Sequence, residues 1–123
     1  MTMAAPDIKA AIGQYLAAVA SGEASKVAAL YADDATLEDP VGSEPHRGRA
    51  AIEAFYGGLQ GEISTELLTA RVAGLEAAFL FRVVTKAGDA TYTIEPIDVM
   101  TFNDAGQITS MRAFWAPEDM TAA

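Results

Sequence analysis

The sequence predicts an α+β fold in which three N-terminal helices pack on a curved, mostly antiparallel sheet. In the first half of the chain, apolar residues recur at helical spacing. In the second half, runs of β-branched and aromatic residues alternate with short turns that carry Gly and Asp. Helices followed by an antiparallel meander of strands are typical of this class. At 123 residues, the chain is expected to form one domain over residues 1–123.

Three helices are predicted in the first half of the chain. The first covers residues 7–21 and lies between Pro6 and Gly22. Proline lacks an N–H that the start of a helix does not need, and glycine suits a left-handed cap at its end. Its apolar stripe consists of Ile8, Ile12, Tyr15, Leu16 and Val19. Two more helices are expected at residues 23–31 and 49–57, each with apolar residues on one face.

Strands are predicted for the rest of the chain. A short strand from Ala35 leads into a Pro- and Gly-rich loop. Four strand-like runs follow: ISTELLTARV, AAFLFRVV, ATYTIEPIDVMTF and QITSMRAFW. The segments KAGDA and NDAGQ separate the last three runs and have the composition of hairpin loops.

Composition and charge exclude several classes of function. The absence of cysteine rules out disulfides, thiolate nucleophiles and cysteine-ligated metal clusters. A formal net charge of −9 would repel a phosphate backbone, so we expect no nucleic-acid partner and a neutral or apolar ligand. The apolar runs are too short to span a bilayer, and the first residues lack the features of a secretory signal. We therefore expect no membrane association and a cytoplasmic location.

Three further patterns give no support to metal, serine or nucleotide chemistry. His46 is the sole histidine, lies in the loop SEPHRGR and is expected to be exposed, without neighbours spaced for a metal site. Ser43 and Ser110 have no histidine base at a plausible spacing. No glycine-rich phosphate fingerprint follows a strand. No metal and no cofactor are therefore predicted.

Asp98 is a carboxylate in the middle of the apolar strand EPIDVMTF. Strand alternation places it on the same side as Met100, while Ile97 and Val99 point to the other side. An isolated carboxyl there would raise its pKa and stay protonated, which would make it a hydrogen-bond donor. The other interpretation is an aspartate bonded to the backbone or to an arginine. The pattern alone leaves both open.

Tyrosines and a second aspartate add polar groups to the expected interior. Tyr15, Tyr31 and Tyr56 lie on the inward faces of the three predicted helices, as core residues or as a cluster of hydroxyls. Asp39 precedes Pro40 at a strand end, which suits an ordinary turn but also a mobile general base. The neighbouring residue Glu38 should face the opposite way.

The stretch YADDATLEDPVGSEP, at residues 31–45, resembles the bacterial Δ5-3-ketosteroid isomerases, or steroid Δ-isomerases. The resemblance continues through GRAAIEAFY, EPIDVMTFNDAGQI and SMRAFW, and covers nearly the whole chain, from about residue 12 to residue 115. These enzymes belong to the superfamily of nuclear-transport-factor-2-like folds. The resemblance therefore implies a cone-shaped fold and an isomerase that works without a cofactor.

The resemblance also implies roles for individual residues. Asp39, in the EDP motif, matches the family's general base. Tyr15 and a protonated Asp98 match its oxyanion hole, and Tyr31 and Tyr56 match a supporting network of hydroxyls. The apolar residues that line the family's steroid slot have these counterparts here: Val41, Phe55, Phe81, Val99, Met111 and Trp115.

The implied reaction converts Δ5-3-ketosteroids to Δ4-3-ketosteroids by proton transfer through a dienolate. A small steroid is then the substrate, and a homodimer through the outer face of the sheet is expected. The apolar residues predicted to face outward are Val72, Ile97, Val99 and Phe114. Two other functions stay open: a non-catalytic ligand-binding or dimerisation module of the same fold, and a related enzyme such as a polyketide cyclase or epoxide hydrolase.

Overall fold

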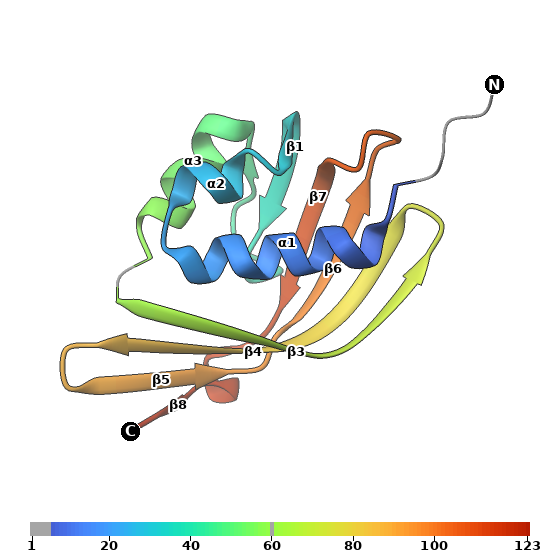
Figure 1. Ribbon diagram of the computed structural model, residues 1–123. Helices are drawn as coiled ribbons and strands as arrows, with labels where there is room; N and C mark the ends of the chain where they lie inside the picture. The colour runs from blue at the N-terminus through green and yellow to red at the C-terminus, as the bar shows by residue number, and fades with distance from the viewer. Residues whose placement is uncertain (1–5, 60) are drawn as a thin grey trace.

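The computed structural model describes residues 6–59 and 61–123 and confirms the predicted α+β class. Three helices lie on one side of a curved sheet, and α1 crosses the strands (Figure 1). The helices are α1 (Ile8–Ser21), α2 (Ala24–Ala28) and α3 (Arg49–Gly57), with a short 3-10 helix at Pro117–Asp119. The prediction of one domain over residues 1–123 stays a prediction, and residues 1–5 and 60 lie outside the described residues.

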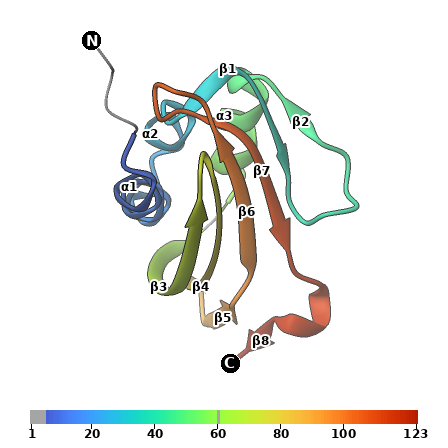
Figure 2. The same ribbon diagram turned by 90° about the vertical axis from the view of Figure 1, so that its right-hand side faces the viewer.

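The described residues form one sheet with the order β2-β1-β7-β6-β4-β5-β8, and β3 pairs with β4 off this path. All pairs are antiparallel except β1 with β7, which is parallel. The strands are β1 (Tyr31–Glu38), β2 (His46–Arg47), β3 (Glu62–Ala73), β4 (Glu76–Ala87), β5 (Ala90–Ile94), β6 (Ile97–Phe102), β7 (Ile108–Phe114) and β8 (Thr121–Ala122). The sheet curves around the side that carries the helices (Figure 2).

Helix α1 begins and ends close to where the sequence predicts. The Asp7 carboxylate accepts a hydrogen bond from the backbone N–H of Ala10 at 3.0 Å, which satisfies a free donor at the helix start. Gly22 ends the helix with φ of 75°, a left-handed conformation that glycine adopts at little cost. All five predicted apolar residues of the stripe are buried. Helix α1 is therefore fixed over the sheet by its own sequence.

The structure corrects several predicted boundaries. Helix α2 ends at Ala28, and Tyr31 is the first residue of β1, because its segment pairs in parallel with β7 at Ile108. Strand β1 thus begins four residues before the predicted start. The run ATYTIEPIDVMTF is divided at Glu95–Pro96 into β5 and β6, which both pair with β4. The short strand β8 was not predicted.

His46 also differs from its prediction. It is half-buried rather than exposed, belongs to β2, and its ring lies 5.0 Å from that of Phe55.

Across residues 6–59 and 61–123, none of the helices has the length and apolar character needed to span a bilayer.

Gly61 joins α3 to β3 at a place where a side chain does not fit. A Cβ atom there would lie 2.5 Å from the backbone oxygen of Lys86, and φ is +103°. We expect Gly61→Ala to lower the free energy of unfolding by about 2–4 kcal/mol, since both overpacking and a positive φ are costly. Gly13→Ala, in open space on α1, should instead raise it by about 0.5–1 kcal/mol. Urea unfolding measures both, and equal effects would contradict the close approach at Gly61.

Candidate active site

A cavity of about 420 Å³ lies between the helices and the curved face of the sheet. Its walls come from α1, α3 and the strands β3 to β7, and most of its surface is apolar. Tyr15, Asp39 and Asp98 all line it. The structure therefore brings together three residues of which any two are at least 24 positions apart in the sequence. An apolar pocket with a few convergent polar groups is the usual form of a small-molecule site.

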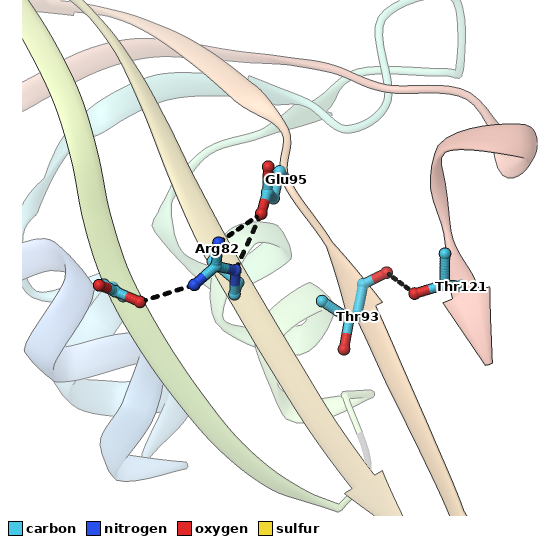
Figure 3. A network of polar contacts seen from close by, with 5 residues as sticks. Arg82, Thr93, Glu95 and Thr121 are labelled. Atoms are coloured by element: carbon cyan, nitrogen blue, oxygen red, sulfur yellow. Dashed lines mark hydrogen bonds and ion pairs between the residues drawn. The ribbon is translucent and has the colours of Figure 1, made fainter. Parts of the chain in front are cut away.

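A hollow of about 530 Å³ lies on the outer side of the sheet, between β5, β6, β7 and the C-terminal segment. Its two carboxylates are already occupied, because Glu95 pairs with Arg82 and Asp119 accepts a hydrogen bond from the backbone N–H of Ala116. Figure 3 shows the Arg82–Glu95 pair and the Thr93–Thr121 bond on this side. The smaller cavity, which holds unpaired polar groups, is the candidate site.

Asp98 lies deep in this cavity, on the central strand β6. Asp98 is 1% exposed, and its side chain faces inward together with those of Met100 and Phe102, as alternation predicts. Neither carboxyl oxygen has a hydrogen-bond partner among the described residues. Burial raises the pKa of the Asp98 carboxyl well above its usual value, and the negative charge of Asp39 raises it further. Both effects favour the protonated form of Asp98, which carries an O–H donor.

The arginine partners considered for Asp98 are engaged elsewhere. Arg82 binds Glu66 and Glu95 at 2.9 and 2.8 Å, and Arg112 binds Glu38 at 3.1 Å. All three pairs involve partly exposed side chains away from the cavity. Asp98 has no backbone or arginine partner among the described residues, so the interpretation of Asp98 as a paired aspartate is wrong.

Three tyrosine hydroxyls form a chain beside Asp98. The Tyr56 oxygen lies 2.8 Å from the Tyr15 oxygen and 2.8 Å from the Tyr31 oxygen. Burial is the main cause that raises the pKa of each hydroxyl well above the ordinary value, so all three stay protonated. If Tyr31 donates to Tyr56 and Tyr56 donates to Tyr15, the Tyr15 proton is left to point into the cavity.

The chain positions Tyr15 from three different elements. Tyr15 comes from α1, Tyr31 from β1 and Tyr56 from α3. The Tyr15 ring also packs edge-on against Phe79, with centroids 6.3 Å apart. Tyr15 and Tyr56 line the cavity, whereas Tyr31 is fully buried behind them. The helices and the sheet thus hold one phenol at a fixed place in an apolar wall.

Asp39 follows β1 directly and enters the cavity from its other side. Its Oδ1 accepts a hydrogen bond from Trp115 Nε1 at 2.6 Å. Burial raises the pKa of the Asp39 carboxyl, and the indole hydrogen bond partly opposes this rise. Glu38 points the other way, as predicted, where the backbone N–H of Gly42 and then Arg112 lower its pKa. Only one of the two neighbouring acids therefore enters the cavity.

The apolar residues predicted to line the slot are divided by the structure. Phe55, Phe81 and Trp115 lie in the cavity wall. The other three predicted residues are not among the described lining residues: Val99 lies on the outer face beside Arg71, Met111 is buried in the core, and Val41 sits in the loop after β1. For Val99 the reason is alternation, since its neighbour Asp98 points inward.

Several lining residues were missed by the sequence reasoning. Val83 and Thr85 continue the inward face of β4 that begins with Phe79 and Phe81, so extending that alternation would have found them. Val19 lies one helical turn after Tyr15 on the same stripe, and Ala113 lies two residues before Trp115, so periodicity would have found them as well. The other missed residues have no comparable local signal: Pro40, Leu59, Ile63, Ile94, Pro96 and Met120. Among the described residues, no group of three or more His, Asp or Glu side chains is placed to hold a metal ion.

Comparison with known proteins places this geometry in a family. The SnoaL-like domain matches residues 12–111 of the chain. The chain belongs to the SnoaL-like domain family. A steroid Delta-isomerase from Nocardioides simplex is 64% identical over 115 residues, which cover 93% of this chain and 94% of that protein. This relative confirms the predicted resemblance and the prediction of an isomerase.

Solved structures share the SnoaL-like fold. The epoxide hydrolase/cyclase-like enzyme SalBIII, which takes part in pyran ring formation in the polyether salinomycin, matches with a TM-score of 0.87 and 25% identity. The match covers 94% of this chain and 95% of SalBIII. The protein RV0760c from Mycobacterium tuberculosis matches with a TM-score of 0.88 and 23% identity, over 100% of both chains. These neighbours confirm the predicted fold class of helices on a curved sheet.

The hydrogen bond from Trp115 sets how easily Asp39 ionises. The indole N–H stabilises the charged carboxylate, so its removal in Trp115→Phe should raise the Asp39 pKa further above the usual value. The carboxylate form would then be lost at a higher pH on acidification. Titration of the Asp39 carboxyl carbon by NMR measures the change, with the exposed carboxyls of the same sample as reference. A pKa that stays the same or falls would contradict this role of Trp115.

Proposed function

We propose that the protein is a steroid Δ-isomerase that converts Δ5-3-ketosteroids to Δ4-3-ketosteroids. The observation that carries the proposal is a pair of aspartates in opposite environments within one apolar cavity. Asp98 is buried and neutral, with no partner among the described residues, while Asp39 is half-buried and holds an indole hydrogen bond that favours its charged form. The 64% identity to a steroid Delta-isomerase supports the substrate class.

In the proposed mechanism, Asp39 acts as the general base. Its carboxylate removes a proton from C4 of the steroid, and the electron pair of the C4–H bond moves into the ring system toward the C3 carbonyl. The product is a dienolate whose negative charge lies on the C3 oxygen. Asp39, now protonated, returns the same proton to C6, which moves the double bond into conjugation. No oxidant, reductant or external acid is consumed.

Tyr15 and Asp98 form the proposed oxyanion hole. Each offers one O–H donor to the C3 oxygen, and neither is ionised at neutral pH because burial raises both pKa values. Donors fixed in an apolar site stabilise a developing oxyanion more than the neutral ketone, which lowers the barrier. A positioned base contributes roughly 10²–10⁴-fold and one such donor about 10²–10³-fold in rate. Together these groups suffice for a fast reaction without a cofactor.

One alternative has a specific observation in its favour. SalBIII, at 25% identity, is an epoxide hydrolase/cyclase-like enzyme of the same fold. Epoxide chemistry would need an acid that protonates the epoxide oxygen as its C–O bond breaks, and a base that takes the proton of the attacking hydroxyl or water. A neutral Asp98 and an ionised Asp39 in one cavity would supply both groups, so turnover of steroid is the discriminating measurement. A non-catalytic module, in contrast, gives no reason to bury an unpaired carboxyl.

A homodimer and a cytoplasmic location stay predictions. The outer face exposes Ile97 by 45% and Phe114 by 42%, which is consistent with burial against a second copy of the chain.

Asp39→Asn should abolish most of the turnover. The amide cannot accept the C4 proton, so we expect kcat to fall by roughly 10²–10⁴-fold while the fold and steroid binding persist. The assay follows the absorbance of the conjugated enone formed from 5-androstene-3,17-dione. Glu38→Gln, one residue away and outside the cavity, is the matched control and should keep turnover. Near-normal isomerisation by Asp39→Asn would reject the assignment of the base.

Substitutions at Asp98 distinguish a hydrogen-bond donor from a space-filling residue. Asp98→Asn keeps a neutral donor, whereas Asp98→Leu keeps only bulk. We expect Asp98→Leu to lower kcat by about 10²–10³-fold, as the loss of an oxyanion donor does, and Asp98→Asn to cost clearly less. The same enone assay measures both variants, and circular dichroism checks their folding. Equal losses in two well-folded variants would count against a donor role for Asp98.

A further inference from the structure

Thr85 is a polar residue of the cavity wall that the proposed mechanism does not use. The polar side chains of the reacting end are Tyr15, Asp39, Tyr56 and Asp98, and the Trp115 N–H is bonded to Asp39. Apart from these, Thr85 supplies the one hydroxyl, amide or charged group among the described lining side chains. The other described lining side chains are hydrocarbon or thioether groups. A lone hydroxyl in such a wall can offer a ligand a hydrogen bond that its neighbours cannot.

Strand β4 leads from the buried end of the cavity to its open end. Its inward residues are Phe79, Phe81, Val83 and Thr85; the first two are buried and the last two are half-buried. The lining residues Leu59 and Met120 are 45% and 39% exposed. Both are far from Thr85 in sequence, but the fold brings their segments toward it. Leu59 precedes Gly61, where an added Cβ would lie 3.2 Å from Cγ2 of Thr85, and Met120 precedes β8, which pairs with the neighbouring strand β5. Thr85 is therefore at the mouth.

The register fixes where this mouth lies relative to the reacting end. Asp98 on β6 is the direct partner of Phe79 on β4. Thr85 lies six residues beyond Phe79 on the same face, which corresponds to about 20 Å along a curved strand. The cavity wall extends from Asp98 along the inward face of β4 to Thr85. A flat, rigid ligand that places a carbonyl oxygen at Asp98 and lies along this wall brings its far end toward the Thr85 hydroxyl.

The Thr85 hydroxyl is available for such a contact. The hydroxyls of Thr65 and Thr121 donate to backbone carbonyls, whereas no hydrogen bond of the Thr85 side chain is found among the described residues. A threonine hydroxyl can both donate and accept, so it suits a ketone as well as an alcohol.

We propose that Thr85 is a specificity-determining residue that binds an oxygen substituent on the far ring of the steroid. This inference rests on the proposed function and adds to it a residue that distinguishes 3-ketosteroids with a ketone or hydroxyl at or next to C17 from those without one. The contact is remote from the reacting atoms, so it forms equally in the ground state and the transition state. It therefore acts on KM and leaves the chemical step alone.

The test compares two substrates and three variants. The substrates are 5-androstene-3,17-dione and its 17-deoxy analogue 5-androsten-3-one, and the readout is the ratio of their kcat/KM values. Thr85→Val should reduce the preference for the 17-ketone by roughly 3- to 10-fold, the effect of one neutral hydrogen bond, mainly through KM. Thr85→Ser keeps the hydroxyl and should keep the preference. Thr93→Val, the same change on the outward face of β5, is the matched control and should also keep it.

A binding measurement separates failure of this inference from failure of the proposed function. Trp115 is the sole tryptophan and lines the cavity, so quenching of its fluorescence reports binding of saturated 3-ketosteroids with and without the 17-ketone. Turnover of neither Δ5 steroid by the wild-type protein would overturn the proposed function. A substrate ratio and a binding ratio that are the same in wild type and Thr85→Val would overturn the role of Thr85 alone.

Discussion

The burial of the Asp98 carboxyl is the constraint on which the rest of the site depends. Strand β6 lies between β4 and β7, so the strand has no open edge at which the side chain could reach water. Its inward neighbours Met100 and Phe102 are core residues. An ionised carboxylate in such a place would need a cation or several donors, and the described residues supply none. Burial therefore favours Asp98 as a neutral acid, and this form is the one that can act as a donor in the proposed oxyanion hole.

The second aspartate helps to keep the first one neutral. Asp39 and Asp98 share the same cavity, and the negative charge of Asp39 adds to the burial that raises the Asp98 pKa. The reverse influence is not the main one on Asp39, whose raised pKa comes from burial and is moderated by Trp115. Two like charges in one apolar cavity would repel each other, which disfavours ionisation of both. The deeper burial of Asp98 favours its neutral form, and the indole N–H favours the ionised form of Asp39.

Local patterns predicted well those elements whose structure is determined locally. Helix α1 follows from its stripe and its two caps, and the orientation of Asp98 follows from alternation along β6. Tyr31 was misplaced in a helix because its strand is created by parallel pairing with β7, some 77 positions later, and no nearby residue signals that contact. Leu59 and Met120 were missed for the same reason, since chain segments far apart in sequence close the mouth.

The site itself was predicted in a different way. Residue patterns left Asp98 open between two interpretations and left Tyr15 open between a core residue and a member of a hydroxyl cluster, so their pairing came from the resemblance to a family. The same transfer failed for Val99, which cannot share a cavity with its neighbour Asp98 on one strand.

The proposed reaction explains why neutral donors suit this site. One negative charge occupies the cavity throughout: first on Asp39, then on the steroid oxygen. A cation in place of Tyr15 or Asp98 would bind the Asp39 carboxylate and lower its basicity. Neutral donors stabilise the negative charge on the steroid oxygen without lowering the basicity of Asp39.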